Sequence, residues 1–198
     1  MLPPKATLDV ILGELHLDIK SRGLDAFWNL RTYLLNLDKL TNSEGKIDRE
    51  DLKDALVTWG VSLSKTYFDA VIDIVDVTKT GLISWPDFLA LIRGPLPAER
   101  EYLISQVWSS LADAAGKPGA LSPDDLAAFF NPKEHPLVAL GGAPEKDAFA
   151  HFLRHLSVKG RAPTIVRLEG FQSYYADLSA GVDDDGHFEQ IVRGSWPV

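Results

Sequence analysis

One sequence pattern occurs three times in this chain and constrains its fold more than any other feature. Residues 44–56 (EGKIDREDLKDAL), 80–92 (TGLISWPDFLALI) and 118–130 (PGALSPDDLAAFF) align without gaps. In each copy a glycine is followed two positions later by an aliphatic residue, and four positions after that by an aspartate and a hydrophobic residue. A fourth copy, 164–175 (TIVRLEGFQSYY), keeps the apolar positions but lacks the glycine and the acid where they align. This repetition predicts a fold built from one supersecondary unit used several times.

Helical patterns lie on both sides of every copy. Before the first copy, Phe27, Leu30 and Leu34 recur at helical spacing, and comparable patterns flank the other copies. Glycine and proline concentrate between these segments. Apolar residues three or four positions apart indicate amphipathic helices, and glycine or proline indicates where a helix ends. The pattern predicts eight helices in four helix–loop–helix units, with a leading helix near 7–20 and a trailing helix near 184–194.

The segment RGPLP (93–97) is the expected boundary between two halves of the chain, because its glycine and prolines end helices. Four parts are expected in order: an N-terminal helix (1–20), a first pair of units (21–93), a second pair (98–180) and a C-terminal helix (181–198). Within each pair, the short segment after the glycine position is expected to form a two-residue β-bridge with its twin.

The pattern G-x-[IL]-x-x-x-[DE]-hydrophobe in paired helix–loop–helix units resembles that of the EF-hand family. Beyond the repeat, the chain resembles the calcyphosin family. That resemblance rests on SRG, NLDKL and GKIDREDLKDAL at the first unit, NPKEHP after the third, FQSYYADLSAGVDDDGHFEQIV from the fourth onward, and a closing SW. It covers roughly residues 10–196. It implies an all-α EF-hand fold with two lobes of paired units plus N- and C-terminal helices, and a cytosolic, calcium-linked regulatory role without enzymatic activity.

The second loop is the best candidate for a calcium site. Such a loop supplies oxygen ligands at positions 1, 3, 5, 7, 9 and 12, with a glycine at position 6. In this loop those ligand positions hold Asp76, Thr78, Thr80, Leu82 (through its carbonyl), Ser84 and Asp87. Two carboxylates and several hydroxyls neutralise little of the ion's charge. The sequence therefore predicts that calcium binds here weakly, in the millimolar range of low-charge sites, or not at all.

The first loop contains two extra residues between Asp38 and Gly45, so that a count back from Asp51 places Leu40 at position 1. A leucine cannot ligate calcium, and Asp38 is the expected displaced first ligand. Asn42 and Glu44 could also contribute oxygen atoms. A rearranged site in this loop is therefore an alternative.

The third and fourth loops offer less. The third provides Asp113 and Asp125, with glycine and proline where further oxygen ligands are needed. The fourth has Lys159 at position 1, Arg161 at position 3 and Gly170 at position 12. Because cations stand where the ligands of a metal belong, the fourth loop is not expected to bind calcium.

Apolar stripes at both chain ends suggest helices that fill a groove. The trailing helix carries Phe188, Ile191 and Val192, with Trp196 just beyond. These residues either fill the groove of their own lobe or are offered to a protein partner, and they are the candidate partner-binding residues. The leading stripe raises the same question with Leu8, Ile11, Leu12, Leu15 and Ile19.

Asp147, His151 and His155 recur four residues apart on one predicted helix, a spacing that can hold zinc. No third ligand is evident near the histidine pair in the sequence. Histidines of the surface or core are the simpler interpretation.

Composition excludes several classes of partner and site. The net charge of −8 disfavours nucleic acid or an anionic membrane as the main partner, because both require a basic surface. The chain has no cysteine, which removes disulfides and cysteine-ligated zinc. No apolar run is long enough to span a bilayer and no secretory signal is visible, so a cytoplasmic location is expected. Nucleophile-elbow, phosphate-loop and HExxH motifs are absent, and the chain is not expected to be an enzyme.

Two functional hypotheses follow from the sequence. The first is an EF-hand scaffold or regulatory adaptor that binds other proteins, with calcium binding weak or lost. A cytoskeletal partner, such as the axonemal microtubules of a cilium or flagellum, is compatible with this hypothesis by analogy of fold. The alternative is a calcium sensor that uses the Asp76–Asp87 loop, either alone or together with the Asp38–Asp51 loop. In a sensor, calcium would open a groove for a target.

Overall fold

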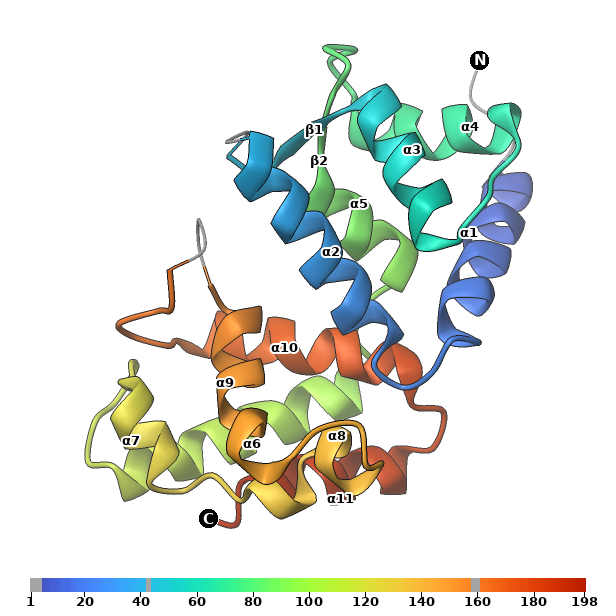
Figure 1. Ribbon diagram of the computed structural model, residues 1–198. Helices are drawn as coiled ribbons and strands as arrows, with labels where there is room; N and C mark the ends of the chain where they lie inside the picture. The colour runs from blue at the N-terminus through green and yellow to red at the C-terminus, as the bar shows by residue number, and fades with distance from the viewer. Residues whose placement is uncertain (1–4, 42–43, 158–160) are drawn as a thin grey trace. The chain divides into compact units, whose positions relative to one another are not determined.

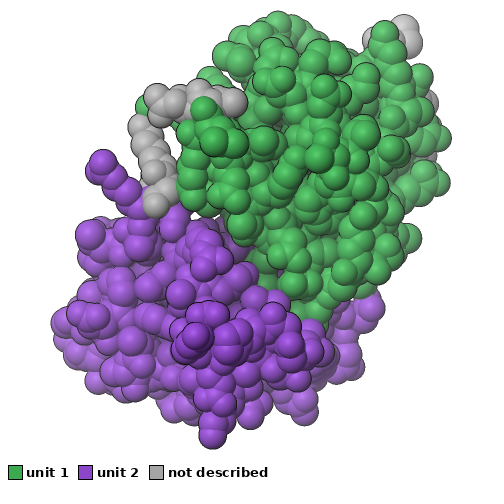
Figure 2. All heavy atoms as spheres, viewed as in Figure 1, with its two compact units in different colours: residues 1–95 green, residues 96–198 purple. Residues whose placement is uncertain are grey.

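The computed structural model describes residues 5–41, 44–157 and 161–198, and most of them are helical (Figure 1). The named strands of these ranges are two segments of three residues each. The predicted all-α, EF-hand-like fold class is confirmed. The chain divides into two compact units, Met1–Pro95 (unit 1) and Leu96–Val198 (unit 2), and the division lies within the RGPLP segment (Figure 2). Among the described residues, every helix is too short or too polar to span a bilayer.

Unit 1 consists of two helix–loop–helix motifs and a preceding helix. Its elements are α1 (Lys5–Lys20), α2 (Ala26–Thr41), β1 (Lys46–Asp48), α3 (Arg49–Trp59), α4 (Lys65–Val75), β2 (Leu82–Ser84) and α5 (Trp85–Arg93). The strands pair antiparallel, with Ile47 opposite Ile83, and both side chains are buried. This pairing joins the two loops back to back and is the expected bridge between twin segments.

The helices of unit 1 begin and end at residues suited to those positions. Asp48, Ser64 and Ser84 cap the first turns of α3, α4 and α5, because each side chain accepts a hydrogen bond from a backbone N–H of that turn. Gly60 ends α3 in a left-handed conformation with φ of 104°. Glycine adopts such a conformation without strain, so the chain can leave the helix there.

Unit 2 contains the second pair of loops. Its elements are α6 (Ala98–Ala114), α7 (Pro123–Ala127), the 3-10 helix η1 (Pro132–Glu134), α8 (Pro136–Ala139), α9 (Glu145–His155), α10 (Leu168–Gly181) and α11 (Asp185–Ser195). A single β-bridge between Leu121 and Val166 takes the place of the strand pair of unit 1. Both residues are buried.

The helix predicted after the third loop is shorter than its sequence pattern suggests. Helix α7 ends at Ala127, so Phe129 and Phe130 lie outside it. Pro132 and Pro136 follow closely, and each starts a further short helix, η1 and α8. Because proline has no backbone N–H to donate and disfavours the helical conformation of the residue before it, a continuous helix cannot pass through this segment.

Candidate functional site

The carboxylate of Asp76 holds the second loop together from inside. It accepts hydrogen bonds from the Gly81 N–H at 2.8 Å, the Thr80 N–H at 3.0 Å and the Thr80 hydroxyl at 3.2 Å. Only 5% of the residue is exposed. Burial raises the pKa of this carboxyl, but the hydrogen bonds from Gly81 and Thr80 outweigh burial and hold the pKa below its usual value. Asp76 is therefore an ionised carboxylate that is already coordinated by donors of its own loop.

The other candidate ligands of the second loop are arranged less favourably for a cation. Thr78 and Asp87 are exposed. The hydroxyl of Ser84 accepts a bond of 3.4 Å from the Asp87 N–H and thereby caps α5. The described residues contain no cluster of three or more His, Cys, Asp or Glu side chains that could hold a metal. The donor set of this loop is limited to two carboxylates and neutral oxygens, which supply little charge to compensate that of a cation.

The first loop is anchored in the same way as the second. Asp38 is buried, and its carboxylate accepts a bond of 2.8 Å from the Gly45 N–H, which matches the bond from Gly81 to Asp76. The bond spans seven residues rather than five, which reflects the two extra residues of the first loop. Leu40 is 84% exposed and contributes nothing to the loop interior. Asn42 lies outside the described residues.

The final acid position of the first loop is less enclosed. Asp51 is exposed in the first turn of α3. Glu44 adopts a left-handed conformation with φ of 54° immediately before Gly45. A cation in the first loop would therefore meet one buried carboxylate, that of Asp38, and further oxygens at the protein surface.

In the third loop, a lysine side chain binds the carboxylate at position 12. The ammonium group of Lys117 donates to both oxygens of Asp125, at 2.7 and 2.8 Å. The N–H and hydroxyl of Ser122 donate to the same carboxylate at 2.9 and 2.7 Å. The bond from Lys117, followed by those from Ser122, lowers the pKa of Asp125 to about 2. A tethered cation thus stands where a calcium ion would meet this carboxylate, and Asp113 is exposed.

Position 12 of the fourth loop is Gly170, which lies within α10 and has no carboxylate. Arg161 is exposed, and Lys159 lies outside the described residues. The described part of this loop therefore offers no carboxylate at the final ligand position.

The apolar stripe of α11 lies inside unit 2. The exposed fractions are 0% for Phe188, 7% for Ile191, 0% for Val192 and 1% for Trp196. The ring of Trp196 lies 5.0 to 5.5 Å from the rings of three phenylalanines of the same unit. Of the two alternatives left open by the sequence, the structure has the self-docked one, and these side chains are covered by their own unit.

Arg100 secures this docking, and sequence reasoning did not identify it. Its guanidinium is buried and donates to the carbonyls of Ser179 and Val182 at 2.9 and 2.8 Å, and to a carboxylate oxygen of Asp185 at 2.7 Å. It also lies 4.7 Å from the centre of the Phe188 ring. These groups belong to the last turn of α10, the turn that follows it and the first turns of α11. No local sequence signal distinguishes Arg100 from a surface arginine.

Asp147, His151 and His155, the residues with a spacing that can hold zinc, form no metal-binding cluster within the described part of the chain. Asp147 is exposed, whereas His155 is buried with Nε2 at 3.4 Å from a carboxylate oxygen of Asp177. A third histidine, His135, contacts the hydroxyl of Tyr174 at 2.6 Å, and burial lowers its pKa to about 3. These histidines belong to the aromatic core of unit 2.

Comparison with known proteins gives distant similarities. No known family model matches the chain. The chain is 24% identical over 192 residues to crustacean calcium-binding protein 23 from Faxonius limosus, with 97% of this chain and 93% of that protein covered. It is also 36% identical over 66 residues, a third of each chain, to myosin regulatory light chain 2 from Bombyx mori. Together with the paired helix–loop–helix units, these similarities support an EF-hand calcium-binding kind of protein.

Proposed function

We propose that the protein is a calcyphosin-like EF-hand adaptor that binds other proteins, with weak calcium binding confined to unit 1. One observation carries this proposal: protein groups already satisfy the carboxylates around which calcium would bind. Loop amides donate to Asp38 and Asp76, and Lys117 donates to Asp125. Loops braced in this way keep their shape without an ion.

The charge of the donor set limits the affinity for calcium. The second loop supplies the carboxylates of Asp76 and Asp87, while Thr78 and Thr80 supply neutral hydroxyls. Affinity in loops of this type rises with the number of charged ligands and with the rigidity of the site. We therefore expect a dissociation constant of about 1 mM for unit 1, comparable with low-charge calcium modules.

Protein binding is the proposed activity because one relative is named a calcium-binding protein and the other a regulatory light chain of myosin. Neither name denotes an enzyme. A cytoplasmic, cytoskeletal partner is proposed by analogy with that light chain, and an axonemal partner in a cilium or flagellum by analogy of fold. The net charge of −8 favours a partner with a basic surface.

A calcium sensor is the second candidate function. The relative that aligns over 97% of this chain is named a calcium-binding protein, and the second loop keeps acids, Asp76 and Asp87, at its first and last ligand positions. In that case calcium bound by unit 1 would change the angle between its helices and expose a groove.

Isothermal titration calorimetry on chelator-treated protein distinguishes the two functions. For the adaptor we expect heat that saturates only near 1 mM calcium, a concentration typical of low-charge sites, or no heat at all. Asp87→Asn should weaken any such response. Asp54→Asn is the matched control, because Asp87 in the first turn of α5 and Asp54 in the middle of α3 are both exposed aspartates of the helices that follow the loops. Heat that saturates below about 10 µM and disappears in Asp87→Asn would establish the sensor instead.

A further inference from the structure

Within unit 1, helix α1 packs against the helices of the two loops in the manner of a bound target helix. Its residues Ile11, Leu15 and Ile19, each four positions apart, are 2%, 1% and 0% exposed. Leu8 and Leu12 of the same predicted stripe are half-buried. The helix contacts α2, α4 and α5, which are helices of the two loop units. Amphipathic helices that bind a groove present apolar side chains at this spacing.

Two polar contacts connect α1 to the ends of the exiting helices. The Nδ1 atom of His16 lies 3.2 Å from the carbonyl oxygen of Ile92, in the last turn of α5. Arg22, in the turn after α1, donates to the carbonyl of Gly60 at 2.6 Å and lies 5.0 Å from the ring centre of Trp59. Carbonyls at helix ends have no partner within the helix, so α1 and its turn satisfy both. The position of α1 is thereby linked to the positions of α3 and α5.

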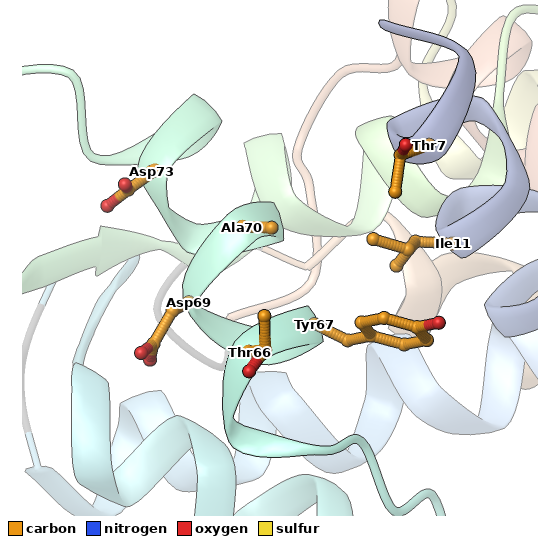
Figure 3. Close-up of a pocket in the computed structure, with 7 residues that line it drawn as sticks. All are labelled: Thr7, Ile11, Thr66, Tyr67, Asp69, Ala70 and Asp73. Carbon is orange, nitrogen blue, oxygen red and sulfur yellow. The ribbon is translucent and has the colours of Figure 1, made fainter. Parts of the chain in front are cut away.

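The contact between α1 and α4 is incomplete. A cleft of about 380 Å³ lies between them, lined from α1 by Thr7 and Ile11 and from α4 by Thr66, Tyr67, Asp69, Ala70 and Asp73 (Figure 3). On its other side α1 exposes Val10 (57%) and Leu17 (63%). Arg22 is itself exposed at the surface. The polar contacts of Arg22 therefore lie at the surface, where such contacts contribute little stability, and the packing of α1 on α4 is open at the cleft.

We propose that α1 can be released from the surface formed by α2, α4 and α5, and that an amphipathic helix of a partner protein takes its place there. Such a helix would carry apolar side chains at i, i+4 and i+8, the spacing with which Ile11, Leu15 and Ile19 are docked. This inference rests on the proposed adaptor function and specifies the kind of partner that unit 1 accepts.

Competition between α1 and the partner follows from the short connection. The segment from Ser21 to Asp25 joins α1 to α2, so α1 stays close to its docking site when it is released. A tether of this kind corresponds to an effective concentration of about 1 mM. An external helix binds only the fraction of molecules in which α1 is released, and its apparent affinity is lowered by that fraction. Weakening the docking of α1 must therefore strengthen the binding of an external helix.

A fluorescent peptide with the sequence of residues 5–20 tests this competition on the full chain. The variant Leu15→Ser removes a buried docking residue, and Leu17→Ser, on the same helix but 63% exposed, is the matched control. We expect Leu15→Ser to bind the peptide at least about tenfold more tightly than the unmodified chain, because more molecules have α1 released. Leu17→Ser should leave the affinity unchanged. Equal binding by Leu15→Ser and the unmodified chain would overturn the proposal.

Hydrogen exchange on the unmodified chain gives a second test that does not depend on how a variant folds. We expect the α1 amides to exchange faster than those of α2 and α5, because α1 is released without unfolding of unit 1. Equal exchange rates would mean that α1 is a permanent part of the core. Both experiments are performed with chelator present, so their outcome is independent of whether calcium binds as proposed above.

Discussion

At the scale of single residues, the carboxylates of the loops are held by donors of the protein itself. Asp76 and Asp38 accept hydrogen bonds from backbone N–H groups, while Asp125 accepts them from Lys117 and Ser122. Bonds to an ionised carboxylate favour its charged form, which is why the pKa of Asp76 and that of Asp125 lie below their ordinary values. The acids at position 1 of the unit 1 loops thus accept from groups of their own loops, whereas the acid at position 12 of the third loop accepts from the ammonium group of Lys117 as well as from Ser122.

The variant Lys117→Met should raise the pKa of Asp125 from about 2 toward its ordinary value of 3.8, because the bond from Lys117 is the largest cause of the shift. A carboxyl whose pKa is lowered by folding contributes stability above its unfolded pKa, and loses it as the pH falls through the folded pKa. The contribution of Asp125 is therefore lost between about pH 4 and pH 2. Carboxyl-detected NMR titration measures the pKa directly. Lys146→Met, at an exposed position of α9, is the control, and an unchanged pKa in Lys117→Met would refute the role of Lys117.

At the scale of elements, the end helices complete the two units. Within unit 1, α1 packs on α2, α4 and α5 and reaches carbonyls at the ends of α3 and α5. Within unit 2, α11 packs on α6, and Arg100 of α6 binds the turn that leads into it. The two end helices differ in their polar contacts, because Arg100 beside α11 is buried whereas Arg22 after α1 is exposed.

Replacement of Arg100 by lysine should destabilise unit 2 by about 3 kcal/mol, since a lysine cannot reproduce the planar set of donors and buried carbonyls lose their partners. Chemical unfolding monitored by tryptophan fluorescence measures this change. Arg193→Lys is the matched control: Arg193 lies in α11, is half exposed and pairs with Glu189. An exposed pair of this kind contributes less than about 1 kcal/mol. Equal effects of the two substitutions would contradict the structural role assigned to Arg100.

At the scale of the whole molecule, the repeated loops and the pairing of twin loops were predictable, and the other long-range contacts were not. The glycine and the aliphatic residue of the first two copies fix each loop and its bridge, so the paired segments around Ile47 and Ile83 follow from their spacing. The anchoring role of Asp38 was also predictable, because the regular count places Leu40 at position 1, a leucine cannot ligate, and Asp38 is the nearest acid before it. The acceptors of Arg100 lie about eighty residues away in the sequence, and no local pattern reveals them.

The bond between Lys117 and Asp125 also escaped prediction. The two residues lie eight positions apart in a loop whose length departs from the repeat, so their contact depends on the folded path of that loop. Likewise, whether the C-terminal helix binds a partner or packs on its own unit depends on contacts across the whole of unit 2. The pattern of Phe188, Ile191 and Val192 is the same in both cases.

Loop-resolved calcium titration by amide NMR tests the central claim most directly, that unit 1 retains weak cation binding while Lys117 replaces the cation in unit 2. The N–H groups of Gly45 and Gly81, which donate to Asp38 and Asp76, report on unit 1, and those of Leu121 and Ser122 report on unit 2. We expect the unit 1 signals to shift only as calcium approaches about 1 mM, with no shift in unit 2. Shifts that saturate at micromolar calcium, or shifts of Leu121 and Ser122 along with them, would contradict it.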